Sequence, residues 1–211
     1  NAMITIINYG AGNLFSVEKA FAALGAEVRV SGKANDILSS DKIVLPGVGA
    51  FGDCMKQLKA SGLIPAIQEC VDREVPLLGI CVGLQILFSG SEESFGIEGL
   101  GLLRGHVRKI SAPNEKIPHM GWNALDISEA HRDKGLFKSV PQASYVYFVH
   151  SYHAVPAELS IISSTCFYGE KITASISAGN IMATQFHPEK SGDTGLKVIQ
   201  NFIRNGQEGS R

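Results

Sequence analysis

Short apolar runs alternate with longer amphipathic segments through the first half of the chain. The apolar runs have the length of buried strands, and they cover residues 3–8, 27–30, 43–45 and 77–80. Helical segments are predicted over residues 14–24, 55–60, 64–73 and 84–88. Asn13 is a suitable N-cap for the first helix, and Gly25 is a suitable stop. This strand–helix alternation predicts βαβ units and a parallel sheet.

The second half of the chain is richer in strands. Short strand-like segments follow one another with glycine, proline, asparagine or serine between them, at residues 105–110, 122–127, 145–149, 159–166, 172–177 and 181–186. A closing helix is predicted over residues 194–204. We therefore expect one α/β domain over residues 3–205, with antiparallel strands added to a mostly parallel central sheet. Residues 1–2 resemble a tag-cleavage scar, and a frayed end is expected over 206–211.

Composition narrows the classes of function. The chain has 211 residues, 45% of them hydrophobic, and a formal net charge of -1. That balance provides no basic surface for nucleic acid or an anionic membrane, and no apolar run approaches the roughly 18 residues of a membrane span. The four cysteines lack C-x-x-C spacing, which favours a reduced, cytoplasmic protein over a disulfide framework or a zinc site. A small ligand or a protein partner is the expected target.

A candidate nucleophile lies between the predicted strand 77–80 and the predicted helix 84–88. Cys81 is held there between Gly79 and Gly83, which is the G-x-S-x-G elbow pattern with cysteine in place of serine. Such a bend exposes the middle side chain, and the helix that follows favours a thiolate. The N–H of Val82 would then face a developing oxyanion. The alternative is a buried structural cysteine between two glycines.

A cysteine nucleophile needs a base, and the strongest of the six histidines is His187. It follows a predicted strand, as Cys81 does, and the carboxyl ends of parallel strands face a common crevice. Glu189, two residues further on, is placed to orient the imidazole ring. His150, also at a strand end, is the second candidate for the base. The alternative is a strand-terminal histidine followed by a solvated glutamate.

A glycine-rich turn follows the third predicted strand. Gly47, Gly49 and Gly52 spell G-x-G-x-x-G, but helical sequence occupies the place about 20 residues on where a dinucleotide site needs its ribose-binding acid. We therefore reject a dinucleotide site. Two interpretations are left: a turn that presents backbone N–H groups beside the elbow, or a plain tight turn.

Residues 79–85 together with residues 185–189 resemble the class I glutamine amidotransferase family. The resemblance implies a flavodoxin-like three-layer sandwich that hydrolyses the side-chain amide of glutamine and needs no cofactor or metal. It implies a triad of Cys81, His187 and Glu189. It also implies further roles for backbone and pocket residues: oxyanion-binding N–H groups at Val82 and Val48, and a glutamine pocket of Gly49, Gln85, Ser151 and Tyr152.

Other segments resemble, within that family, the glutaminase subunits of imidazole glycerol phosphate synthases of histidine biosynthesis. They are residues 8–13, 45–52, 118–123, 147–152 and 187–191. The resemblance implies a heterodimer with a (β/α)₈ cyclase subunit, which would receive the ammonia directly. It offers four candidates for the interface: Asn13, Trp122, Tyr147 and Lys190. For each of them, ordinary surface or loop packing is the alternative.

Three other functions stay open at this point. The chain could be the glutaminase of a different biosynthetic pathway, which would share the triad but not the segments around Asn13 and Trp122. It could be a cysteine-containing sensor protein of similar sheet architecture without glutaminase chemistry. It could also be a catalytically silent subunit that only regulates a synthase.

Overall fold

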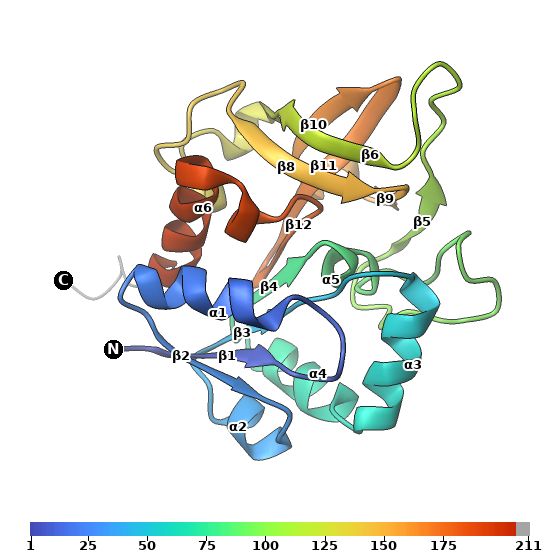
Figure 1. Cartoon of the computed structure of the whole chain (residues 1–211). Helices are drawn as coiled ribbons and strands as arrows, with labels where there is room; N and C mark the ends of the chain where they lie inside the picture. The colour runs from blue at the N-terminus through green and yellow to red at the C-terminus, as the bar shows by residue number, and fades with distance from the viewer. Residues whose placement is uncertain (206–211) are drawn as a thin grey trace.

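One eight-stranded sheet organises the part of the chain, residues 1–205, that this computed structural model describes (Figure 1). Residues 206–211, where a frayed end was expected, lie outside that part. In spatial order the strands are β2 (Glu27–Ser31), β1 (Met3–Ile7), β3 (Lys42–Leu45), β4 (Leu77–Ile80), β12 (Ile181–Thr184), β11 (Glu170–Ala178), β10 (Ile162–Tyr168) and β7 (Asp126–Ile127). β2 to β12 are parallel, whereas β11, β10 and β7 join antiparallel.

Helices cover both faces of the parallel strands. Figure 1 shows α1 (Leu14–Ala23) with α6 (Gly192–Arg204) on one side, and α2 (Ala34–Leu38) with α4 (Ile64–Asp72) on the other. α3 (Phe51–Ser61) and the short α5 (Val82–Gln85) complete the set. Because both faces are covered, β3, β4 and β12 are buried at every position, which explains their unbroken apolar runs. The predicted flavodoxin-like sandwich is confirmed, with the strand order that this fold uses.

Two antiparallel ribbons stand on the second half of the sheet. β5 (Gly105–Lys109) pairs with β9 (Tyr152–Pro156), and β6 (His119–Ala124) pairs with β8 (Tyr145–His150). Short 3-10 helices connect other elements: η1 (Glu129–His131), η2 (Gly135–Phe137), η3 (Leu159–Ile161) and η4 (Pro188–Lys190).

Several element predictions were wrong in detail. The predicted strand 122–127 is two strands, because β6 ends at Ala124 and Asp126 then pairs with β10 in the other sheet. β9 was missed because only Ser151 separates it from β8, and α2 because five residues show no helical period. The predicted strand 159–166 begins as the 3-10 helix η3. The helix after Cys81 starts two residues earlier than predicted.

Asn13 does not cap α1 with its side chain, contrary to the prediction. Its carbonyl accepts the first helical hydrogen bond, from the N–H of Val17 at 3.2 Å. Gly25, at φ 76°, closes this helix as expected. The last helix, α6, is capped by the buried Lys42 of β3. Its Nζ donates to the carbonyls of Phe202 (2.8 Å) and Ile203 (2.6 Å) at the end of that helix. The first and last parts of the chain are thereby joined.

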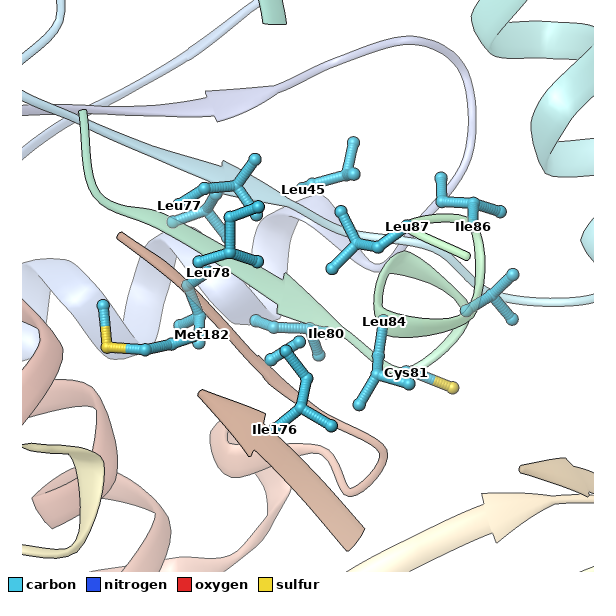
Figure 2. Packing of buried hydrophobic residues seen from close by; sticks show 14 of the residues in the cluster. Leu45, Leu77, Leu78, Ile80, Cys81, Leu84, Ile86, Leu87, Ile176 and Met182 are labelled. Atoms are coloured by element: carbon cyan, nitrogen blue, oxygen red, sulfur yellow. The ribbon is translucent and has the colours of Figure 1, made fainter. Parts of the chain in front are cut away.

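The backbones around the elbow approach too closely for side chains. A Cβ on Gly83 would lie 2.0 Å from the carbonyl oxygen of Leu45, and one on Gly47 would lie 2.8 Å from the N of Gly83. The end of β3 and the start of α5 therefore meet through backbone atoms. Behind them, apolar side chains of β4 and the following turns pack together (Figure 2).

We expect Gly83→Ala to lower the free energy of unfolding by more than about 3 kcal/mol, because a methyl group there must displace the backbone of β3. Urea unfolding followed by circular dichroism measures the change. Gly90→Ala is the matched control, since its nearest neighbour would be 3.9 Å away. A loss below about 1 kcal/mol for Gly83→Ala would contradict this packing.

Candidate active site

Three neighbouring strand ends converge at the candidate active site. β3, β4 and β12 lie side by side and parallel, and they lead into the glycine-rich turn, into Cys81 and towards His187. The N–H of Cys81 donates to the carbonyl of Thr184 at 2.8 Å, which ties the end of β4 to the end of β12. The structure therefore brings together the two residues that the sequence placed at strand ends.

Cys81 has a strained backbone. Its φ of 57° and ψ of -115° lie outside the regions that non-glycine residues prefer. The strain persists because β4 ends immediately before Cys81, α5 begins immediately after it, and both are buried. Figure 2 shows the result: the sulfur of Cys81 points away from Ile80 and Leu84, which pack behind it. This strand–turn–helix geometry is the one that the G-x-S-x-G pattern predicts.

His187 and Glu189 form a buried pair. Nδ1 of His187 and Oε1 of Glu189 are 2.7 Å apart, and the two side chains are 2% and 1% exposed. Burial lowers the pKa of His187, but hydrogen bonding and charge from Cys81 and from Glu189 outweigh it, so that this pKa is raised. The imidazolium form of His187 is thus favoured. A carboxylate on Nδ1 leaves Nε2 as the atom that can exchange a proton with the sulfur.

His150, the second candidate for the base, has both ring nitrogens engaged. Its Nδ1 lies 2.9 Å from the carbonyl oxygen of Tyr152, and its Nε2 lies 2.8 Å from Nδ1 of His119. Burial lowers the pKa of His150 to about 3. A histidine that is neutral and doubly hydrogen-bonded is a poor proton acceptor, so the geometry favours His187.

A cavity of about 330 Å³ opens in front of Cys81 and His187. The residues predicted for the glutamine pocket and the oxyanion site all line it: Gly49, Gln85, Ser151, Tyr152, Val48 and Val82. Gln85 also donates from Nε2 to the carbonyl of Tyr152 at 3.1 Å, which joins two walls of the cavity.

The sequence analysis named no role for three lining residues, Pro118, Val149 and Glu93, of which Glu93 is the charged one. It belongs to the loop between α5 and β5, and its Oε2 accepts the N–H of Phe51 (3.1 Å) at the start of α3. Among the described residues that line the cavity, it is the one acidic side chain. The acidic character of residues 92–93 was the available signal, but the sequence alone does not indicate which way a loop carboxylate points.

The expected oxyanion donor is occupied. The N–H of Val82 donates to the carbonyl of Gly47 at 3.1 Å, and so it is not free to meet a substrate oxygen. In this conformation the N–H of Val82 therefore does not face the cavity as a free donor. The physical reason is that a buried backbone N–H takes a partner, and the carbonyl of the adjacent turn provides one.

The carbonyls on either side of Gly47 are also held. The hydroxyl of Tyr9 donates to the carbonyl of Pro46 at 2.5 Å, and Sγ of Cys54 donates to the carbonyl of Val48 at 3.3 Å. The peptide between Gly47 and Val48 therefore lies between two fixed carbonyls.

Comparison with known proteins agrees with this geometry. A family model described as glutamine amidotransferase class-I matches residues 5–205. This chain belongs to the class-I glutamine amidotransferase family. One similar protein is the imidazole glycerol phosphate synthase subunit HisH of Moorella thermoacetica, 48% identical over 199 residues, with 94% of this chain and 93% of that protein covered. The protein of the same name from Methanocaldococcus jannaschii is 49% identical over 201 residues, with 95% and 98% covered.

Solved structures share the fold at lower identity. The structure of PurLQS from Thermotoga maritima superposes with a TM-score of 0.74 at 20% identity, and the match covers 96% of this chain and 98% of that one. A crystal structure described as a glutamine amidotransferase gives a TM-score of 0.70 at 16% identity, with 95% and 98% covered. At these identities the likeness supports the amidotransferase fold alone.

Three of the four predicted interface residues of this amidotransferase lie close together. Trp122 of β6 and Tyr147 of β8 are opposite one another in the ribbon, with ring centroids 6.3 Å apart. Ser191, next to the exposed Lys190, accepts the N–H of Tyr147 at 3.0 Å. Asn13 lies half-buried before α1. The outer face of the ribbon, made of the exposed Met120, Trp122 and Tyr145 and the half-buried Tyr147, is largely aromatic.

Among residues 1–205, no helix is long and apolar enough to cross a membrane. The same described part of the amidotransferase has no group of three or more histidine, cysteine or acidic side chains that could hold a metal ion.

We expect iodoacetamide to alkylate Cys81 before the other three cysteines. Burial raises the pKa of Cys54, Cys70 and Cys166 and keeps them as thiols at neutral pH, whereas Cys81 lines the cavity beside His187. Peptide mapping by mass spectrometry after brief labelling identifies the reactive site. First labelling at any other cysteine would contradict the assignment.

Removing the charge of Glu189 should slow this labelling. In Glu189→Gln the pKa of His187 falls, because one of the groups that raise it has lost its charge. His187 then loses its proton at a lower pH, so that less of it is imidazolium at pH 7. We therefore expect labelling of Cys81 at pH 7 to slow by roughly tenfold. The exposed Glu158→Gln is the control, and equal rates in both variants would argue against the pair.

Proposed function

We propose that the chain is a glutaminase subunit that hydrolyses the side-chain amide of glutamine and delivers the ammonia to a synthase partner. The observation that carries the proposal is the convergence of Cys81 and the His187–Glu189 pair on one cavity of about 330 Å³. That volume lies at the small end of the range for ligand pockets, which suits an amino acid.

The proposed reaction runs through a covalent intermediate. The Cys81 thiolate attacks the amide carbon of glutamine, and the C–N bond breaks as the His187 imidazolium gives its proton to the departing ammonia. The neutral His187 then takes a proton from water, which attacks the glutamyl thioester. Collapse of that second tetrahedral intermediate releases glutamate and restores the thiolate. Glu189 keeps the ring of His187 oriented throughout.

Catalysis of this kind needs the oxyanion donors to be free. The proposal therefore requires the peptide between Gly47 and Val48 to turn, which would release the N–H of Val82 and present that of Val48. Each such donor is worth on the order of 3 kcal/mol of transition-state stabilisation. A chain in the conformation described here should therefore be a slow glutaminase until a partner or substrate turns this peptide.

The partner that we propose is a (β/α)₈ cyclase subunit of imidazole glycerol phosphate synthase, in histidine biosynthesis. The names of the relatives at 48% and 49% identity support it. The aromatic face of the β6–β8 ribbon offers apolar area for docking next to the cavity. Direct transfer also suits the product, since ammonia released into water at neutral pH is mostly protonated and a poor nucleophile.

The decisive assay measures glutamate release by the chain together with its cyclase subunit and that subunit's ligand. We expect Cys81→Ala to lower the rate by at least roughly a thousandfold, because it removes the nucleophile. Cys166→Ala is the matched control, since it removes a buried cysteine outside the cavity and should leave the rate nearly unchanged. No glutamate release by the wild-type complex, or full release by Cys81→Ala, would overturn the proposed function.

Glu93 is proposed to bind the α-ammonium group of glutamine. We expect Glu93→Gln to raise KM for glutamine about tenfold with little change in kcat, since the amide oxygen can still accept the N–H of Phe51. Glu92→Gln is the control, because Glu92 bonds to Lys109 outside the cavity.

A substrate that lacks the amino group sharpens the test of Glu93. With glutaric acid monoamide, wild type and Glu93→Gln should have equal kcat/KM. A large loss with this substrate as well would show that Glu93 acts elsewhere.

A further inference from the structure

A chain of hydrogen bonds runs from β6 to the wall of the cavity. Nδ2 of Asn123 lies 3.2 Å from Nε2 of His119. Nδ1 of His119 lies 2.8 Å from Nε2 of His150, and Nδ1 of His150 lies 2.9 Å from the carbonyl oxygen of Tyr152. The two histidines face one another across the β6–β8 ribbon. Four side-chain and backbone groups are thereby joined in one line.

The direction of every bond in this chain follows from its last acceptor. A carbonyl can only accept, so Nδ1 of His150 carries the proton, and in a neutral ring Nε2 must accept. His119 therefore donates from Nδ1 and accepts at Nε2, from the amide of Asn123. The orientation of that amide is fixed independently, because its nitrogen also donates to the carbonyl of Phe167 (2.9 Å) and its oxygen accepts the N–H of Ala124 (2.8 Å).

The surroundings keep both rings neutral and in place. His119 is 2% exposed and is stacked between Phe148 and Tyr168, with ring centroids 4.7 and 4.2 Å away. Burial lowers the pKa of His119 to about 4, in line with the low pKa of His150. Both rings are therefore neutral at pH 7, and stacking and hydrogen bonds hold them in this arrangement.

The carbonyl at the end of the chain belongs to the cavity wall. Tyr152 and Ser151 line the cavity, and the same carbonyl accepts a second hydrogen bond from Nε2 of Gln85. Gln85 Nε2 also donates to Gln185 at 3.0 Å. The carbonyl of Tyr152 is thus the point where the histidine chain and the elbow helix α5 meet.

We propose that His119 and Asn123 are positioning residues that hold the Ser151–Tyr152 wall of the glutamine pocket through His150. The inference rests on the proposed glutaminase function and deepens it. Neither residue lines the cavity. We expect their main effect on substrate binding, because the chain contacts the wall directly at the carbonyl of Tyr152. It reaches Cys81 only by way of Gln85 and Gln185, whose Nε2 lies 3.8 Å from Sγ of Cys81.

The kinetic test uses His119→Phe, which keeps an aromatic ring between Phe148 and Tyr168 but removes both nitrogens. It leaves Nε2 of His150 buried without its donor. We expect KM for glutamine to rise about tenfold in the chain assayed with its cyclase subunit, while kcat stays within about twofold. An unchanged KM, or a fall in kcat alone, would overturn the inference.

Two further variants separate positioning from general damage. His119→Asn keeps an amide nitrogen near the place of Nδ1, and it should recover part of the loss in KM. His131→Phe makes the same substitution at a histidine that bonds to Ser128 away from the cavity, and it should match wild type. Equal KM values for His119→Asn and His119→Phe would count against a hydrogen-bond role.

A measurement on the wild-type chain covers the case in which the variants fail to fold. Nitrogen-15 NMR of labelled histidines at pH 7 should show His119 and His150 neutral, with the proton on Nδ1 in both. A proton on Nε2 of either ring, or a charged ring, would overturn the chain. If wild type releases no glutamate, the proposed function fails. If wild type is active but His119→Phe has the same KM for glutamine, only this inference fails.

Discussion

The strained backbone of Cys81 is the constraint on which the site depends. Its positive φ is held between β4 and α5, and α5 can pack this closely on the end of β3 because Gly83 has no side chain to meet the carbonyl of Leu45. The same close contact draws the turn after β3 against the elbow, while the bond from Cys81 to Thr184 draws in β12 and, with it, His187. Three strand ends thus converge because the backbones there can touch.

The backbone N–H of Val82 has two possible hydrogen-bond acceptors. In the resting fold it donates to the carbonyl of Gly47, whereas the proposed chemistry requires it to donate to the oxyanion of the substrate. It cannot donate to both acceptors at once. The held carbonyls of Pro46 and Val48 restrict the change to the peptide between them. In the proposed function, turning that one peptide would free the N–H of Val82 and present that of Val48.

The sequence predicted the parts of the site that depend on position along the chain. Cys81 and His187 follow apolar runs, and strand ends gather at one edge of a parallel sheet, so their meeting could be expected. The direction of an individual hydrogen bond could not be expected from the sequence. Whether the N–H of Val82 points to solvent or to Gly47 depends on the rotation of one peptide. Glu93 was missed because its loop has no periodicity, and β9 because no turn residues set it apart from β8.

The most direct test of this account is a crystal structure of the chain with its cyclase subunit and a diazoketone analogue of glutamine bound covalently to Cys81. The account predicts that the ketone oxygen lies about 3 Å from the N of Val82 and that the carbonyl of Gly47 has turned away. A structure in which Val82 still donates to Gly47, with the ketone oxygen bound elsewhere, would contradict it.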